Sequence, residues 1–414
     1  MAINADVMVL GAGSVGLGAA LALQARGRSV VLIDRRGAAG QETSFGNAGL
    51  IERASITLYT APRAIDKIVS TLFGRATGAR IDWASAPAIL PWLMQYYWES
   101  APARAAAHAR AALPLIARSL SEHDALAEAA GATHLFRRNG WIKAFRRPQS
   151  FAAGLKDAAA LTAHGLRFER LDGANLAACE PHLNGFLGAV HYLDPVAVVD
   201  PGALSHAYAA LFARRGGRLL EGDARSLEET GRGWRVATRA GSCAAREAVV
   251  ALGPWSDTVY RPLGYEMPLG VKRGYHMHYA PIADAPLSHA VLDADGGYLI
   301  APMTAGLRLT TGAEFARRDA KPSPRQLAQV EPVARASFPL GARRDAHAWL
   351  GARPCLPDLL PVLGPAPRHA GLWFDFGHQH HGLTLGPATG RLLAEMMTGE
   401  APFCDPAPFS AERF

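Results

Sequence analysis

The hydrophobic and polar positions of the first 34 residues predict a strand, a helix and a second strand. Val7–Leu10 is an apolar run that is too short for a helix and is broken at once by glycine, which is typical of a buried strand. A helical run to about Arg26 follows, and Ser29–Ile33 predicts a second apolar strand that ends on Asp34. This order indicates a βαβ-type nucleotide-binding unit in an α/β fold.

The turn between this first strand and the helix has glycines where a dinucleotide would lie. Gly11, Gly13 and Gly16 have the G-x-G-x-x-G spacing. The first glycine permits a tight turn, the second lets the backbone approach a pyrophosphate, and the third lets the helix pack on the strand. Asp34 is placed to accept from a ribose 2′-hydroxyl and would repel a 2′-phosphate. The unit therefore predicts NAD or FAD; the alternative is a glycine-rich turn without a ligand.

Later segments predict that this fold is interrupted and then resumed. Residues 52–135 are mostly helical in pattern, and Asp200-Pro201 is a helix start. Ala248–Ser256 is an apolar strand that ends on glycine and offers a second place where a ligand can approach the backbone. Short strands recur from Pro268 to Leu350 and predict a second α+β domain on a mostly antiparallel sheet.

Composition limits the classes of function. Hydrophobic residues make up 49% of the 414 residues, enough for a sizeable core. The net charge is +7, but the arginine pairs are scattered, so no nucleic-acid partner is expected. The four cysteines form no C-x-x-C and predict reduced thiols. No signal peptide or long apolar run stands out, so we expect a cytoplasmic protein, with peripheral attachment to the inner membrane face left open.

Together these motifs resemble the FAD-dependent amine and amino-acid oxidoreductases related to D-amino acid dehydrogenase and glycine oxidase, over nearly the whole chain. The likeness to the D-amino acid dehydrogenase group rests on Thr43-Ser44-x-x-Asn47-Ala48-Gly49 and on the run from Trp349 through Arg353-Pro354 to Pro357-Asp358. The resemblance implies a Rossmann-like FAD-binding domain, of the glutathione-reductase-like type, over residues 1–60, 151–258 and 350–414. It implies a substrate-binding domain over residues 61–150 and 259–349.

The same resemblance implies how FAD is held. The pyrophosphate is expected on Gly11–Gly16, the isoalloxazine against Ser44–Leu50, and the N-terminus of the helix after Gly382 at the flavin pyrimidine oxygen. Cys355 raises the question of covalent flavin, but its spacing to Pro357-Asp358 is shorter than in sarcosine oxidases, which favours non-covalent FAD. The expected cofactor-binding residues are Gly11, Ala12, Gly13, Ser14, Val15, Gly16, Asp34, Arg35, Thr43, Ser44, Asn47, Ala48, Gly49, Leu50, Ala224 (at the adenine), Gly253, Trp255, Gly377, Gly382, Leu383 and Thr384.

Four residues are expected to act on the substrate. Arg353 is the expected anchor, because a guanidinium grips a carboxylate with two parallel hydrogen bonds. Tyr298 matches a family position whose hydroxyl assists carboxylate binding, and Tyr275 is a second candidate; each is as readily a core residue. His380 is expected to orient the substrate or to tune amine protonation near neutral pH. Glu314 either meets a substrate amine or faces solvent. No metal is expected, because the histidines at 378, 380 and 381 have no carboxylate partner in sequence.

The leading hypothesis is FAD-dependent oxidative deamination of a D-amino acid, including a cyclic one such as D-proline or hydroxy-D-proline. A hydride would pass from Cα to flavin N5, and water would hydrolyse the imine to a 2-oxo acid. A quinone, another electron carrier or oxygen would then accept the electrons. The alternative within enzymes is an N-methyl amino acid (sarcosine/glycine-type) or opine oxidase. Two other classes stay open: an FAD-linked RNA-modifying enzyme and a non-catalytic flavoprotein subunit.

Overall fold

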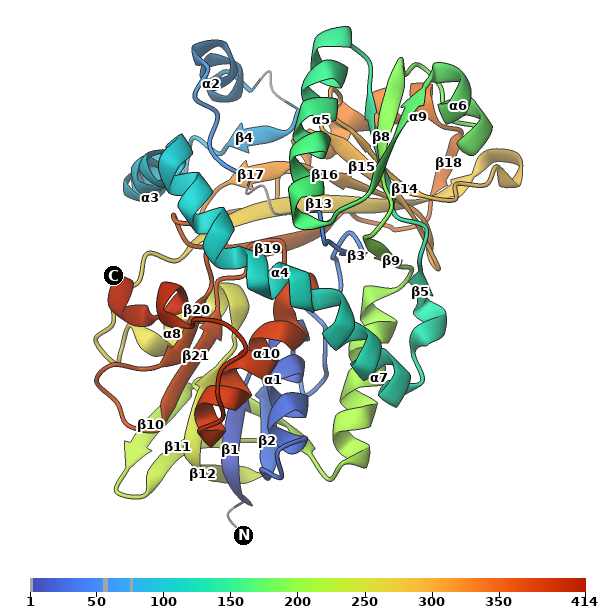
Figure 1. Ribbon diagram of the computed structural model, residues 1–414. Helices are drawn as coiled ribbons and strands as arrows, with labels where there is room; N and C mark the ends of the chain where they lie inside the picture. Colours follow the sequence, from blue (N-terminus) through green and yellow to red (C-terminus); the bar gives the residue numbers. More distant parts are fainter. Residues whose placement is uncertain (1–2, 55–58, 75–76) are drawn as a thin grey trace.

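The computed structural model describes residues 3–54, 59–74 and 77–414, and two large sheets dominate them, one in the lower and one in the upper half of Figure 1. Within these residues the lower sheet has seven strands in the order β1-β2-β10-β11-β12-β21-β20, with β1 also paired to β12. Its strands are β1 (Ile3–Leu10), β2 (Val30–Asp34), β10 (Arg218–Thr230), β11 (Gly233–Thr238), β12 (Gly241–Val250), β20 (Val362–Pro365) and β21 (Leu372–Phe376).

The centre of this first sheet is parallel and joins segments that are far apart in the chain. β1 pairs in parallel with β2 on one side and with β12 on the other. β2 continues in parallel to β10, and β12 to β21. Val7–Leu10 is completely buried, as a parallel strand covered on both faces must be. The prediction of a nucleotide-binding fold that is interrupted and resumed is therefore confirmed.

The upper sheet has eleven strands within the described residues and is mostly antiparallel, as predicted. Its central strand β13 pairs with β16, β17, β18 and β19, and two of the sheet's pairings, β14 with β6 and β17 with β4, are parallel. Its strands are β4 (Ala79–Ile81), β6 (Trp141–Phe145), β7 (Phe168–Asp172), β8 (Gly188–Tyr192), β13 (Gly270–Pro281), β14 (Ala290–Asp293), β15 (Tyr298–Met303), β16 (Gly306–Thr311), β17 (Ala313–Phe315), β18 (Leu340–Arg343) and β19 (Trp349–Cys355).

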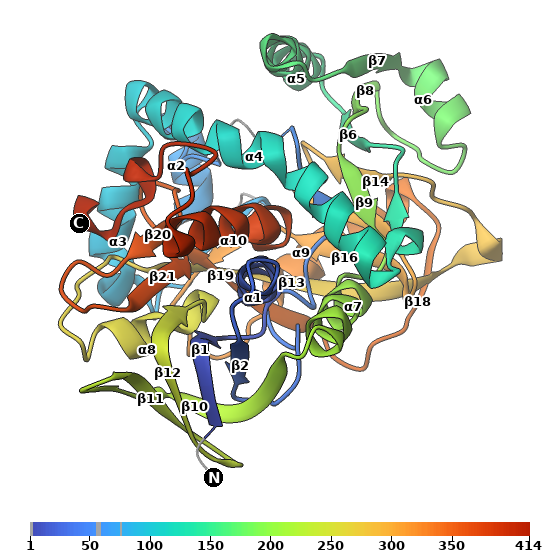
Figure 2. The same cartoon turned by 60° about the horizontal axis from the view of Figure 1, so that its bottom comes forward.

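Helices cover one face of the first sheet, and α9 and α5 pack against strands of the second. α1 packs against α7 and α10, and α4 packs against the same two helices, so these four form a layer beside β1 and β2 (Figure 2). No helix in the described ranges is both long and apolar enough to cross a bilayer. The helices are α1 (Ser14–Gln24), α2 (Ile65–Leu72), α3 (Ala86–Glu99), α4 (Pro102–Ala130), α5 (Pro148–Leu161), α6 (Gly173–Cys179), α7 (Pro201–Arg214), α8 (Asp257–Tyr260), α9 (Arg325–Ser337) and α10 (Gly382–Thr398).

The sheets divide the chain at points other than the expected domain boundaries. β7 and β8 lie inside the expected FAD-binding segment 151–258, yet they extend the second sheet through β6. β19 lies almost entirely inside the expected segment 350–414, yet it pairs with β13 of the second sheet. Residues 1–2, 55–58 and 75–76 of the expected segments lie outside the described residues. A small third sheet, β3 (Leu50–Ile51), β9 (Val196–Val198) and β5 (Phe136–Arg137), links the two regions.

The contact between α1 and α10 is made by backbone rather than by side chains. A Cβ atom added at Gly18 would lie 2.3 Å from the carbonyl oxygen of Gly386, and one at Gly390 would lie 2.3 Å from the carbonyl carbon of Gly18. Real Cβ atoms do not approach other atoms so closely, so these glycines are what let the helices touch. The N-termini of α1 and α10 both line the same cavity.

We expect Gly18→Ala to lower the melting temperature, because the added methyl group meets the α10 backbone and must push the helices apart. Overpacking of this kind costs about 1–3 kcal/mol, more than the small gain in helix propensity. Thermal unfolding followed by circular dichroism measures this change. The matched control is Gly231→Ala, where a Cβ atom meets nothing within 4 Å. Equal melting temperatures for the two variants would contradict the close contact.

Candidate active site

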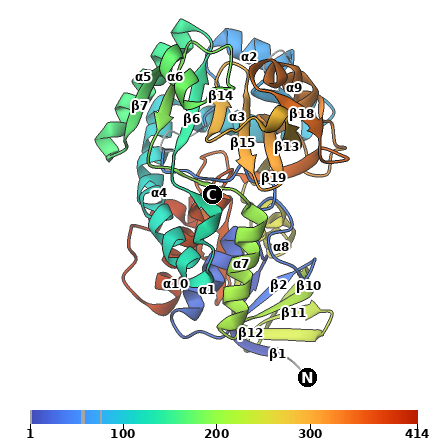
Figure 3. The same ribbon diagram turned by 90° about the vertical axis from the view of Figure 1, so that its right-hand side faces the viewer.

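A cavity of about 1170 Å³ extends from the glycine turn after β1 to the face of β13 and β19. Its walls come from both sheets, since the edge formed by β13 and β19 lies next to the first sheet's helices (Figure 3). A space of this size and shape suits an extended ligand together with a small second molecule.

The glycine turn has the shape that the spacing predicts, and each of its three glycines is required for a different structural reason. Gly11 has φ +105°, and a Cβ there would lie 2.5 Å from the carbonyl oxygen of Ala251. A Cβ at Gly16 would lie 1.9 Å from the carbonyl oxygen of Gly11. A Cβ at Gly13 would meet only the Ser44 hydroxyl, at 3.2 Å, so the missing side chain leaves space in the cavity.

The residues at this turn fit a phosphate-bearing cofactor. The Oγ atom of Ser14, in the first turn of α1, is buried and has no hydrogen-bond partner among the described residues. It sits where the free N–H groups and the positive end of the helix dipole favour an anion. An orphaned hydroxyl and an open glycine at a helix N-terminus are what a pyrophosphate requires.

Asp34 and Arg35 shape the next part of the cavity wall. The Asp34 carboxylate accepts hydrogen bonds from the backbone N–H groups of Ala12 (3.1 Å) and Arg36 (2.9 Å). A carboxylate has about four acceptor positions, so capacity is left for the expected ribose hydroxyl. The Arg35 guanidinium lies 4.0 Å from the ring centre of Trp255 and pairs with Glu42.

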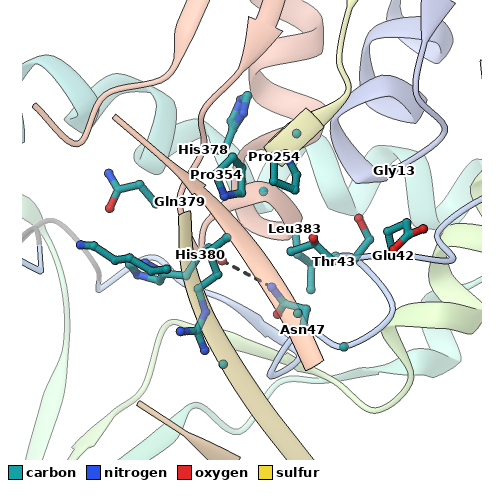
Figure 4. Close-up of a pocket in the computed structure, with 18 of the residues that line it drawn as sticks. Gly13, Glu42, Thr43, Asn47, Pro254, Pro354, His378, Gln379, His380 and Leu383 are labelled. Carbon is teal, nitrogen blue, oxygen red and sulfur yellow. Dashed lines mark hydrogen bonds between the residues drawn. The ribbon is translucent and has the colours of Figure 1, made fainter. Parts of the chain in front are cut away.

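The loop after β2 is tied across the cavity to the second half of the chain. Thr43 Oγ1 donates to the carbonyl of Ala352 (2.8 Å), and Ser44 Oγ accepts from the N–H of Ser14 (3.0 Å). Asn47 Nδ2 donates to the carbonyl of His380 at 3.4 Å, the dashed line in Figure 4. These bonds hold the loop against β19 and the segment after β21, where the isoalloxazine is expected.

The N-terminus of α10 is held by a buried histidine. Pro387 lies inside the helix and has no N–H, so the carbonyl of Leu383 lacks its usual partner. His123 Nε2 donates to that carbonyl instead, at 2.7 Å. Burial lowers the pKa of His123 to about 4, so its ring is neutral at pH 7. The first turn of α10 therefore keeps a fixed position on the cavity wall.

Most of the expected cofactor residues line the cavity, and four do not. Ala12 and Gly16 lie behind the glycine turn, while Gly49 (φ +76°) and Gly377 (φ +87°) provide left-handed backbone conformations beside the cavity. The expected residues that do line it are Gly11, Gly13, Ser14, Val15, Asp34, Arg35, Thr43, Ser44, Asn47, Ala48, Leu50, Ala224, Gly253, Trp255, Gly382, Leu383 and Thr384.

Arg353, on β19, faces this cavity and has no counter-ion among the described residues. Its Nη1 donates to the carbonyl of Gly312 at 3.2 Å, and its guanidinium lies over Gly274, where an added Cβ would be 2.5 Å from Nη2. No carboxylate in the described parts of the chain forms an ion pair with it. Burial lowers its pKa below the usual value, but an arginine side chain stays charged in a protein. The site thus offers a fixed, unpaired guanidinium.

The two expected tyrosines line the same cavity as Arg353, but their hydroxyl groups bond to other residues. Successive side chains of a strand point to opposite faces, and Tyr275 and Tyr298 lie in the apolar cluster on the α9 face of the second sheet. The Tyr275 hydroxyl donates to Glu314 (3.0 Å), and the Tyr298 hydroxyl donates to Ser337 (3.3 Å). Glu314 does not face solvent and does not line the cavity where a substrate amine would lie: it is 1% exposed and paired with Arg273 at 2.6 Å.

His380 lines the cavity, but not as a group that titrates near neutral pH. Burial, reinforced by the neighbouring His381, lowers its pKa well below the usual value, which differs from the expected tuning of amine protonation. Its ring meets Tyr59 edge-on, with centroids 4.5 Å apart. His378, two residues earlier, has its Nε2 atom 3.3 Å from an oxygen of buried Asp375, a carboxylate neighbour that the sequence did not suggest. Among the described residues no group of three or more His, Cys, Asp or Glu side chains is placed to hold a metal ion.

Glu52 and Lys272 are among the ionisable residues on the cavity wall that sequence reasoning missed. Glu52 follows β3, accepts from Trp141 Nε1 (3.1 Å), and has its pKa raised by burial to about 7. Lys272 on β13 is 7% exposed and stands opposite Arg353. The signal for Glu52 is an acidic residue directly after the apolar pair Leu50-Ile51. For Lys272 the signal is that it lies two residues before Gly274 on a strand, so both residues face the same side of the sheet.

The comparisons with known proteins agree with this architecture. The family described as DAO, FAD dependent oxidoreductase, matches residues 6–396. A D-amino acid dehydrogenase from Chromohalobacter salexigens is 30% identical over 99% of both chains, and a D-amino-acid oxidase from Bradyrhizobium diazoefficiens is 30% identical over 99% of this chain and 98% of its own.

A solved structure also shares the fold. Glycine oxidase from Geobacillus kaustophilus aligns over 100% of this chain and 99% of its own, with a TM-score of 0.75 and 23% identity. The match of the family over almost the whole length, together with a cavity that fits a phosphate-bearing cofactor, settles the class of protein. The chain belongs to the DAO family of FAD-dependent oxidoreductases.

Proposed function

We propose that the protein is an FAD-dependent dehydrogenase or oxidase of D-amino acids. The observation that carries the proposal is the unpaired guanidinium of Arg353, fixed in the cavity that continues to the glycine turn. Relatives named D-amino acid dehydrogenase and D-amino-acid oxidase, at 30% identity over nearly the whole chain, support the D configuration.

The residues that would hold FAD lie along one wall of the cavity. The turn at Gly11–Ser14 and the start of α1 suit the pyrophosphate, and Ser44–Leu50 with the N-terminus of α10 would enclose the isoalloxazine. When bound, FAD supplies the acceptor for the hydride that leaves the substrate Cα. The positive end of α10 lies where negative charge on the reduced ring would be stabilised.

The chain's own residues bind the substrate and manage its proton. Arg353 would hold the substrate carboxylate through two parallel hydrogen bonds and so fix the position of Cα. An amine must lose its proton before Cα can give up a hydride, and Glu52 is the buried carboxyl on the cavity wall whose pKa lies near 7. Loss of the hydride and this proton leaves a protonated imine, which water hydrolyses to a 2-oxo acid and a protonated amine.

An anaerobic screen for bleaching of the flavin absorbance tests the proposal. We expect D-amino acids, including cyclic ones, to bleach the flavin faster than their L forms. Preferred bleaching by sarcosine, glycine or opines would favour the alternative, and the structural neighbour named glycine oxidase makes these the relevant competitors. Reoxidation by a quinone or by oxygen then identifies the electron acceptor. A flavoprotein that no amine bleaches would contradict the proposal.

Gly13→Val is expected to yield folded protein without FAD. A Cβ at residue 13 meets only the Ser44 hydroxyl, so the larger side chain fills cavity space rather than displacing backbone. Flavin content is measured from the visible absorbance of the purified protein, and folding from circular dichroism. Gly231→Val is the control with open surroundings. A Gly13→Val protein with full flavin content would show that the pyrophosphate lies elsewhere.

Arg353→Ala is expected to raise KM strongly, a loss of about 2–5 kcal/mol in kcat/KM, while FAD stays bound. Arg353→Lys should restore part of this loss, because a lysine keeps the charge but not the two-pronged geometry. Steady-state kinetics on the best substrate of the screen provides the measurement. The exposed Arg232, changed to Ala, is the control. Unchanged kinetics in Arg353→Ala would show that Arg353 does not hold the substrate carboxylate.

Glu52→Gln is expected to slow flavin reduction by about 10²–10⁴-fold, the usual contribution of a general base. In the unaltered protein the rate should fall as pH falls through about 7, because protonated Glu52 cannot accept a proton. Glu52→Gln should lose that step in the profile. Stopped-flow reduction from pH 5.5 to 9 measures both effects. If the rate falls at low pH in the same way in both proteins, the proton transfer belongs to another group.

A further inference from the structure

Lys272 stands beside Arg353 on the face of the second sheet that borders the cavity. The two residues are direct partners in the antiparallel pairing of β13 with β19. Side chains at such paired positions leave the same face of the sheet, with Cβ atoms about 4.5–5.5 Å apart. Both residues line the cavity. The strand register therefore delivers two cationic side chains to one binding site.

The ammonium group of Lys272 is enclosed by aromatic rings rather than by acids. Its Nζ atom lies 4.0 Å from the ring centre of Tyr96, 5.7 Å from that of Phe315 and 6.0 Å from that of Trp92. No acidic side chain within the described ranges forms an ion pair with it. Aromatic faces attract a cation but bring no net negative charge, so the charge of Lys272 is left uncompensated.

The acidic groups near Lys272 do not balance its charge. Glu314, on the neighbouring β17, lies on the opposite face of the sheet and is paired with Arg273. The Cys355 thiol lies beside Lys272 and Arg353, but burial raises its pKa, so it is protonated at neutral pH. Burial lowers the pKa of Lys272 to about 8, so most molecules still carry the charge at pH 7. Two positive charges thus share a cavity wall without a counter-ion.

The two cations point to different parts of the cavity. The Arg353 guanidinium lies over Gly274 and donates to the carbonyl of Gly312. The Lys272 ammonium lies instead against Tyr96, on α3, at the end of the sheet where α3 meets β4 and β17 (Figure 1). Because each cation has its own surroundings, a ligand with two anionic groups can pair with both.

We propose that Lys272 binds a second carboxylate of the substrate, so that this enzyme prefers amino acids that carry two carboxylates. The inference rests on the proposed function, because Arg353 is assigned the first carboxylate. The second carboxylate could belong to the side chain, as in D-aspartate and D-glutamate, or to a substituent on the amine, as in an imino-diacid. Both present the same chemistry to Lys272, and the substrate panel below separates them.

The test compares the protein with Lys272→Met, which keeps the length of the side chain and removes its charge. The control is Lys156→Met, on the exposed side of α5. For each protein, kcat/KM is measured for D-glutamate, D-aspartate and iminodiacetate and divided by the value for neutral D-alanine and D-proline. Binding is measured separately, as the Kd of succinate and of acetate from the change they cause in the flavin spectrum. Flavin content and melting temperature are checked first.

We expect the protein to prefer a dicarboxylate substrate. Lys272→Met should lower the ratio of kcat/KM for acidic to neutral substrates by about 10–100-fold, which corresponds to one charge-assisted hydrogen bond. The Kd of succinate should rise by the same factor relative to acetate, and Lys156→Met should change neither ratio. If Lys272→Met does not fold, Lys272→Gln replaces it.

Two results would overturn the inference and leave the proposed function standing. One is a protein whose flavin is reduced by neutral D-amino acids in clear preference to acidic ones. The other is an acidic-to-neutral ratio and a succinate Kd that stay unchanged in Lys272→Met. Failure of every amino acid to bleach the flavin is a different outcome, because it removes the proposed function itself.

Discussion

The site depends on a close contact between two helices whose backbones touch at glycines. Gly18 of α1 and Gly386 and Gly390 of α10 let the two backbones touch, and no larger residue fits at these positions. The contact places the N-termini of both helices on one cavity wall, one beside the glycine turn and one beside the loop at residues 44–50. Two helix dipoles can then act on one extended anionic cofactor.

The alternation of side chains along β13 decides which chemistry reaches the cavity. Arg273 and Tyr275 point to the α9 face, where they form a buried network with Glu314. Lys272 and Gly274 point to the cavity, and the missing side chain of Gly274 makes room for Arg353. The same strand therefore contributes Arg273 to a buried ion pair on one face and Lys272 to the cavity on the other. A shift of its register by one residue would exchange the two sets.

Local patterns were enough to predict much of this arrangement. The glycine turn, Asp34, the strand before Gly253 and the start of α10 are short segments whose geometry follows from their own residues. The membership of β7 and β8 in the second sheet could not be read in this way, because it depends on pairing with β6, more than 20 residues earlier. The orientation of Tyr275 and the importance of Lys272 depend on which face each residue of β13 takes. That is fixed by pairing with strands far along the chain, such as β17 and β19.

The order of the segments in the chain bears on how the protein is made. α1 lies near the beginning of the sequence and α10 near its end, yet each forms part of the other's packing surface. During synthesis the first βαβ unit leaves the ribosome long before its partner helix exists. Contacts of such large sequence separation form slowly, and apolar surface stays exposed in the meantime. The coenzyme pocket can be completed only after nearly the whole polypeptide has emerged, so flavin insertion is a late event in maturation.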